Sequence, residues 1–149
     1  MTLPSKGSTV SLRFNSAFEM LDLVQVVSDR ITRMLEFEDD ALVWMEVAVR
    51  ESVINAIKHG NRFDTSKMVF VEFAIRPEHE PRELVVSIRD QGAGFDPDTL
   101  PDPLAPENLL KSSGRGIFFM RSFMDEVCIE QAAGGGTVVR LTKTLPGRA

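Results

Sequence analysis

The sequence predicts an α+β fold, a two-layer sandwich in which a mostly antiparallel mixed sheet carries helices on one face. The predicted elements run in the order strand, helix, helix, strand, strand, irregular segment, short helix, strand, strand. The second and third strands, and the fourth and fifth, are separated by short turn segments, which favours antiparallel hairpins. The 149 residues contain no internal repeat and no interdomain linker, so we expect one domain over 1–149.

The first half of the chain is expected to form one strand and two helices. Residues 9–15 alternate as in a half-buried strand. Ser16 and Glu19 have the spacing of a capping box that would begin the first helix. The second helix is predicted from about residue 40 to 59, with Gly60 at the C′ position, where a glycine often ends a helix.

The second half is expected to supply the other four strands. Residues 68–76 and 83–90 are predicted to form a hairpin around a turn that contains prolines. Residues 91–113 are irregular and carry half of the eight prolines. A short helix at about 115–124 precedes strands at 126–131 and 137–145.

Charge and composition exclude several classes of function. The net charge is −5 and no basic stripe is visible, which disfavours direct binding of nucleic acid. Cys128 is the only cysteine, so no intrachain disulfide can form. The first ten residues lack the apolar core of a signal peptide, and no apolar run is long enough to span a membrane. We therefore expect a cytoplasmic protein.

A narrow polar strip interrupts the second predicted helix. Glu51 and Asn55 are one helical turn apart and share a face, with apolar residues, Ala48 among them, on both sides. The helical wheel places the core-facing stripe opposite, at Leu42, Met45, Val49, Val53 and Ala56. One interpretation is an ordinary exposed Glu and Asn. The other is a carboxylate base beside an amide oxygen able to bind Mg²⁺, and this helix alone does not decide between them.

A second motif follows a predicted strand at residues 90–94, where Asp90, Gly92 and Gly94 form a DxGxG pattern. Glycines let the backbone approach a ligand closely, and the carboxylate could accept a hydrogen bond from an exocyclic amine. On this motif alone, a plain Asp-Gly turn is the better interpretation. The chain has no P-loop, and Pro97 occupies the third glycine position of a dinucleotide-binding GxGxxG motif.

A third motif places Gly114 and Gly116 directly before an apolar helical run, where free N–H groups could bind phosphate. Residues 95–113 form a long irregular segment of the kind that often acts as a lid. Lys111 and Arg115 near its C-terminal end favour a lid over anionic phosphates, and a simple insertion is the alternative.

In this order the three motifs resemble the N, G1 and G2 boxes of the GHKL ATPase superfamily, which includes gyrase, histidine kinases and mismatch-repair ATPases. The boxes are ExxxNAxxHG at 51–60, DxGxG at 90–94 and GxG at 114–116. Within that superfamily, "NAIKHGN" and "GRGIFFMRSFMDEV" are similar to the anti-sigma-factor serine/threonine kinases of bacterial stress and sporulation switches. The resemblance implies the histidine-kinase-like ATPase fold.

The resemblance also implies ATP and Mg²⁺ as cofactors and a role for each matching residue. Asn55 would bind the metal, and Glu51 would be the general base that takes the proton from the acceptor hydroxyl. Asp90 would bind the adenine amino group, with Thr137 supporting that end of the site. The remaining nucleotide-contacting residues would be Gly92, Gly94, Lys111, Gly114, Arg115 and Gly116.

By resemblance, the protein is an ATP- and Mg²⁺-dependent serine/threonine kinase that acts as an anti-sigma factor. It would form a homodimer, sequester a sigma factor and phosphorylate a STAS-domain antagonist. Ser112 stands where sporulation-type members carry an arginine, so either Lys111 or Arg115 would have to reach the γ-phosphate. Three alternatives remain: a non-catalytic ATP-binding partner-switching module, a stand-alone histidine-kinase-type ATPase domain, and an ATPase acting on water.

Overall fold

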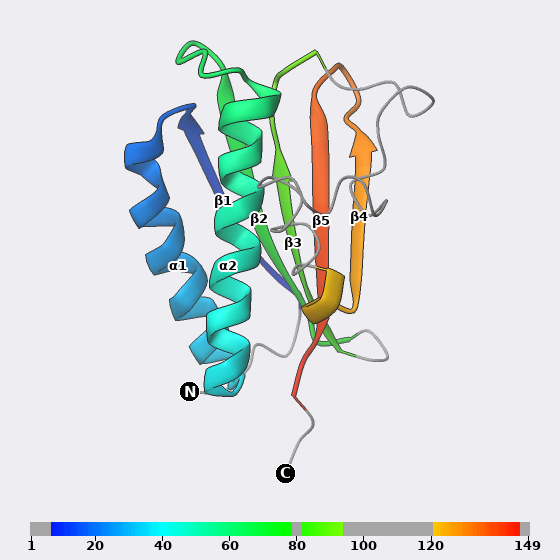
Figure 1. Cartoon of the computed structure of the whole chain (residues 1–149). Helices are drawn as coiled ribbons and strands as arrows, with labels where there is room; N and C mark the ends of the chain where they lie inside the picture. Colours follow the sequence, from blue (N-terminus) through cyan, green and yellow to red (C-terminus); the bar gives the residue numbers. More distant parts are fainter. Residues whose placement is uncertain (1–6, 79–81, 94–120, 147–149) are drawn as a thin grey trace.

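The computed structural model describes residues 7–78, 82–93 and 121–146, which form a five-stranded sheet with two helices on one face (Figure 1). The strands are β1 (Ser8–Asn15), β2 (Met68–Arg76), β3 (Glu83–Arg89), β4 (Glu126–Gln131) and β5 (Thr137–Thr144). Their order across the sheet is β1-β2-β3-β5-β4. The predicted two-layer α+β fold is confirmed. Every pairing among the described strands is antiparallel, so this part of the sheet lacks the parallel pair that a mixed sheet requires.

The helical layer consists of α1 (Leu21–Met34) and α2 (Asp39–Asn55), with a 3-10 turn, η1 (Phe18–Met20), before α1. The predicted capping box is wrong, because no side chain caps η1 or α1. The Ser16 backbone N–H instead donates to the carbonyl of Lys67 (3.0 Å). This bond ties the end of β1 to the segment before β2, and it leaves Ser16 buried ahead of the first helical turn.

The core lies between the helices and one face of the sheet. Alternate residues of β2 point into it, and α2 contributes a broad stripe that includes Met45, Ala48, Val49 and Val53. The helical wheel placed Ala48 beside the polar strip and outside the core stripe, and the structure buries Ala48 to 2 % exposure. It also missed Ser52, which is buried with its hydroxyl donating to the Ala48 carbonyl (2.8 Å). The buried stripe is broad because α2 packs against α1 as well as the sheet.

The end of the second helix differs from the expected glycine cap. After Asn55 the helix widens into a π-helical turn, η2 (Ala56–Gly60), in which the Asn61 N–H donates to the Ala56 carbonyl (2.7 Å). Gly60 is not in the left-handed conformation, which is adopted instead by Arg62 (φ 51°) and Phe63 (φ 62°). Backbone torsion therefore does not require a glycine at position 60. A glycine is needed there because a Cβ would overlap the Asp90 side chain.

Before β4, residues 121–123 are helical and Met124 is buried in the core, which matches the end of the predicted short helix. The rest of that helix and the predicted lid at 95–113 lie outside the described residues. Of the helices in the described part of the chain, none is long and apolar enough to cross a membrane.

Candidate functional site

Asp90 lies directly after β3 and is only 5 % exposed. Its backbone N–H donates to the Thr137 carbonyl (3.0 Å), which extends the pairing of β3 with β5 by one residue. The Thr137 N–H in turn donates a hydrogen bond to Oδ1 of the Asp90 side chain (3.1 Å). The Gly92 N–H donates to the same oxygen (2.9 Å). Two backbone donors therefore hold one carboxylate oxygen and orient the whole group.

The second carboxylate oxygen of Asp90, Oδ2, accepts no hydrogen bond from any of the described residues. Burial raises the pKa of Asp90, while the N–H groups of Gly92 and Thr137 and the charge of Lys67 act in the opposite direction. An oriented, poorly solvated carboxylate with one unused oxygen is suited to accept hydrogen bonds from a ligand donor, such as an amine.

Three glycines surround Asp90 at contact distance. A Cβ at Gly60 would overlap Asp90 Oδ2, and a Cβ at Gly136 would overlap the Asp90 carbonyl oxygen. A Cβ at Gly92 would overlap the Gly60 carbonyl. We call Gly60, Gly92 and Gly136 the glycine cradle. It brings three distant segments together around one carboxylate, because the absence of side chains lets their backbones pack directly against Asp90 and one another.

Glu51 and Asn55 lie one turn apart on α2, and both are half-buried. The same helix continues through η2 to Gly60, which touches Asp90. Figure 1 shows the C-terminal ends of α2 and β3 at the same end of the molecule, at the top of the view. Carboxylate and amide oxygens fit Mg²⁺, which needs few protein ligands when phosphate and water complete its shell. Within the described ranges, no three His, Cys, Asp or Glu side chains form a metal-binding cluster.

The structure brings together part of the site predicted from sequence. Asp90, Gly92 and Thr137 are in direct contact, and Thr137 contacts Asp90 through its main chain. Five predicted residues lie outside the described part of the chain: Gly94, Lys111, Gly114, Arg115 and Gly116. Sequence reasoning missed Gly60 and Gly136 as site residues. The run of three glycines directly before Thr137 was the signal available for Gly136.

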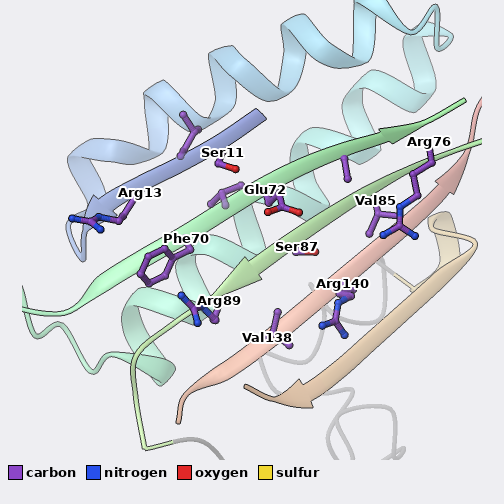
Figure 2. Close-up of a pocket in the computed structure, with 13 residues that line it drawn as sticks. Ser11, Arg13, Phe70, Glu72, Arg76, Val85, Ser87, Arg89, Val138 and Arg140 are labelled. Carbon is purple, nitrogen blue, oxygen red and sulfur yellow. The ribbon is translucent and has the colours of Figure 1, made fainter. Parts of the chain in front are cut away.

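A groove of about 500 Å³ lies on the sheet face opposite the helices (Figure 2). Its lining comes from β1, β2, β3 and β5 and does not include Asp90. Three of its arginines already have partners, Arg76 among them through an ion pair with Glu83 (3.4 Å). Arg140 pairs with Glu130 (2.7 Å), and the guanidinium of Arg89 lies over the Phe70 ring (4.2 Å to its centroid). The groove is therefore a largely self-paired sheet surface, and the glycine cradle is the better candidate site.

The chain is similar to known proteins of one family. Residues 14–143 match the family described as the histidine kinase-like ATPase domain. The chain is 33 % identical over 136 residues to the anti-sigma F factor of Geobacillus thermodenitrificans, covering 89 % of both chains. It is 31 % identical over 138 residues to that of Bacillus subtilis, covering 90 % of both. It is 30 % identical over 138 residues to that of Priestia megaterium, covering 91 % of this chain and 92 % of the relative.

Proposed function

This chain belongs to the histidine kinase-like ATPase domain family, and we propose that it binds ATP with Mg²⁺ and acts as an anti-sigma serine/threonine kinase. The observation that carries the proposal is Asp90 Oδ2, which lies against Gly60 and accepts no hydrogen bond from the part of the chain that the structure describes. An adenine amino group donates hydrogen bonds, and Oδ2 is a charged acceptor that the structure has already oriented. Burial of Asp90 strengthens such a bond, because little water competes for the oxygen.

The remaining nucleotide contacts extend from the cradle along α2. Gly60 and Gly92 let the end of η2 pack closely beside Asp90, and Asn55, one turn before the end of η2, offers its amide oxygen to Mg²⁺. When bound, Mg²⁺ neutralises phosphate charge during transfer. Gly94, Lys111, Gly114, Arg115 and Gly116 complete the proposed contacts with the nucleotide.

Glu51 is the proposed general base. It takes the proton from the acceptor hydroxyl as that oxygen bonds to the γ-phosphorus and the bond to the β-phosphate oxygen breaks. Its half-buried position, with the half-buried Val47 and Ile54 nearby on α2, supports this role. Restricted access of water strengthens the interaction between the base and the hydroxyl and limits transfer to water.

The relatives are named anti-sigma F factors, so the proposed partner is a sigma factor. The proposed protein substrate is a STAS-domain antagonist that carries the acceptor serine or threonine. We propose a cytoplasmic, single-domain chain that works as a homodimer. Sedimentation of the purified protein tests the dimer, and a monomer at micromolar concentration would contradict it.

The central experiment mixes the purified chain with labelled ATP, Mg²⁺ and STAS-domain proteins encoded near its gene. We expect label on a serine or threonine of one antagonist, and no label without Mg²⁺. ATP binding with no phosphoprotein would instead favour a non-catalytic partner-switching module. Release of phosphate without an antagonist would favour an ATPase that acts on water.

A further inference from the structure

Asn61 follows η2, is 1 % exposed, and joins two strand ends through its side chain. Its Nδ2 donates to the Met68 carbonyl (3.0 Å), and its Oδ1 accepts from the Gln91 N–H (2.8 Å). The Gln91 side chain completes a ring, because its Oε1 accepts from the Met68 N–H (2.7 Å). We call these three residues, Asn61, Met68 and Gln91, the amide ring.

The amide ring replaces a pair of backbone hydrogen bonds between β2 and β3. At this end of the sheet, the last paired residues of β2 and β3 are Phe70 and Arg89. If the register continued for two more residues, Met68 would lie opposite Gln91. An antiparallel ladder joins such residues directly. Here the Asn61 side chain lies between them, so it separates the two strand ends next to Asp90.

The position of the ring matters because the Gln91 N–H belongs to the peptide group that follows Asp90. Asn61 holds this peptide from the β2 side, and Thr137 holds Asp90 from the β5 side. The Gly92 N–H, one residue further on, reaches back to Asp90 Oδ1. The direction of the free oxygen, Oδ2, therefore depends on the peptide that Asn61 holds.

The backbone around Asn61 is unusual on both sides. The π-helical turn η2 precedes it, and two consecutive non-glycine residues, Arg62 and Phe63, follow it in the left-handed conformation. Phe63 is held there by a bond from its N–H to the Ile57 carbonyl (2.9 Å). Such backbone is uncommon and concentrates at functional sites, where the surrounding structure imposes it. The unfavourable backbone conformation therefore occurs next to the residue whose side chain lies between β2 and β3.

We propose that Asn61 is a positioning residue for base recognition. By holding the Asp90–Gln91 peptide it aims Asp90 Oδ2 at the base, and so it sets the preference for a purine that carries an exocyclic amine. Asn61 acts through Asp90 and does not itself contact the nucleotide. The inference rests on the proposed function, in which Asp90 is the base contact.

The test compares binding of ATP with binding of purine riboside triphosphate, which lacks the exocyclic amine. We expect the wild-type protein to prefer ATP by about tenfold or more, since a bond to a carboxylate is lost with the analogue. In Asn61→Ala the Gln91 N–H loses its acceptor, so the Asp90 carboxylate is no longer held in one orientation. The preference should fall to about two- or threefold, mainly through weaker binding of ATP.

Asn15→Ala is the matched control. The Asn15 Nδ2 also donates to a backbone carbonyl of the loop before β2, that of Thr65 (2.8 Å), and this hydrogen bond involves neither Gln91 nor Asp90. Both substitutions are expected to lower thermal stability. Only Asn61→Ala should change the ratio of the two dissociation constants, which a merely structural role would leave unchanged.

The outcomes separate this inference from the proposed function. If the wild-type protein binds neither nucleotide, or binds both equally, the role of Asp90 as the base contact fails. If the wild-type protein prefers ATP and a folded Asn61→Ala keeps that preference, the role of Asn61 fails. If Asn61→Ala does not fold, Asn61→Leu decides, because it fills a similar volume and removes the acceptor for the Gln91 N–H. A reduced preference in that variant supports the inference, and an unchanged one overturns it.

Discussion

Asp90 is the residue at which stability and proposed function oppose each other. Its carboxylate is buried and its pKa is raised, so the folded state holds the charged form less favourably than the unfolded chain does. A group of this kind destabilises the folded state at neutral pH. Retention of a charge there is understandable if a ligand donor binds the unused oxygen.

Asp90→Asn should therefore stabilise the nucleotide-free protein at neutral pH while weakening ATP binding by about tenfold or more. The amide oxygen can still accept from Gly92 and Thr137, but no buried charge remains. The loss of folding stability caused by the wild-type carboxylate is absent below its ordinary pKa of 3.8. This loss grows as pH rises from that value through the higher folded-state pKa. The stability gained by the variant should thus increase from pH 4 to 7, as measured by denaturant unfolding.

Asp64→Asn supplies a control of opposite sign. Hydrogen bonds from the Ser66 side chain and backbone lower the pKa of the exposed Asp64 carboxylate. Its stabilising contribution is present above the ordinary pKa and is lost as pH falls through the lower folded-state value. Asp64→Asn should lose stability at neutral pH and bind ATP normally. A stability difference for Asp90→Asn that does not change with pH would contradict its assignment as a destabilised carboxylate.

Glu51→Ala tests the base. ATP binding should persist, and phosphorylation of the antagonist should slow by roughly 10²- to 10⁴-fold, the usual contribution of general-base catalysis. Glu46→Ala removes an exposed carboxylate from the same helix and should leave both activities intact. Single-turnover transfer of labelled phosphate provides the measurement. Transfer by Glu51→Ala at the wild-type rate would show that another group acts as the base.

At the scale of elements, the candidate site lies at the end of the sheet where regular structure stops. The helix α2 ends in a π-helical turn, the pairing of β2 with β3 gives way to side-chain amides, and β5 begins just after three glycines with positive φ. Each irregularity brings backbone close to Asp90. The rest of each strand pairs in regular antiparallel register, which gives these irregular ends a rigid support.

Gly60→Ala tests the contact between η2 and Asp90. The added Cβ would overlap Asp90 Oδ2, so we expect a loss of stability of about 1–3 kcal/mol and at least tenfold weaker ATP binding. Gly134→Ala is the control, because Gly134 has φ +84° but nothing within 4 Å of the added Cβ. It should cost about 1–2 kcal/mol through backbone strain and leave ATP binding unchanged. Calorimetric titration separates the two. Normal ATP affinity in Gly60→Ala would mean that the base does not bind beside η2.

At the scale of the whole molecule, the sheet has two unlike faces. One packs against α1 and α2 to form the core. The other lines the groove with arginines and with Val85 and Val138, which are only 5 % and 7 % exposed and lie outside the main core cluster. The candidate nucleotide site lies at the edge where α2 ends, so ligand binding links the helical layer to the sheet.

Because the site joins both layers, nucleotide binding should stabilise the whole fold. ATP with Mg²⁺ at about 100 times the dissociation constant contributes about 2.7 kcal/mol, which corresponds to roughly 5–10 °C in Tm. A chelator should remove most of this shift. Asn55→Ala should lose the part that depends on Mg²⁺, whereas Asn15→Ala should keep it. An equal Mg²⁺-dependent shift in Asn55→Ala, seen by thermal unfolding, would contradict its role as the metal ligand.

Within the described residues, the sequence by itself determined the strands, the two long helices and their order, and it also selected Asp90, Gly92 and Thr137, which the structure finds in contact. Alternation and helical spacing are local properties, so short stretches of chain are enough to predict strands and helices. The assigned roles of Glu51 and Asn55 also came from sequence, and they stay predictions until the proposed tests are made.

Only the tertiary structure decided how the ends of those elements meet. The π-helical turn, the spacing role of Gly60 and the entry of Asn61 between β2 and β3 leave no periodic pattern in the sequence. Each depends on contacts between residues far apart in the chain, as in the approach of Gly60 and Gly136 to Asp90. Local preference would have placed a left-handed glycine at the helix end. Packing against a buried carboxylate overrode that preference, because any side chain at Gly60 would occupy the space of Asp90.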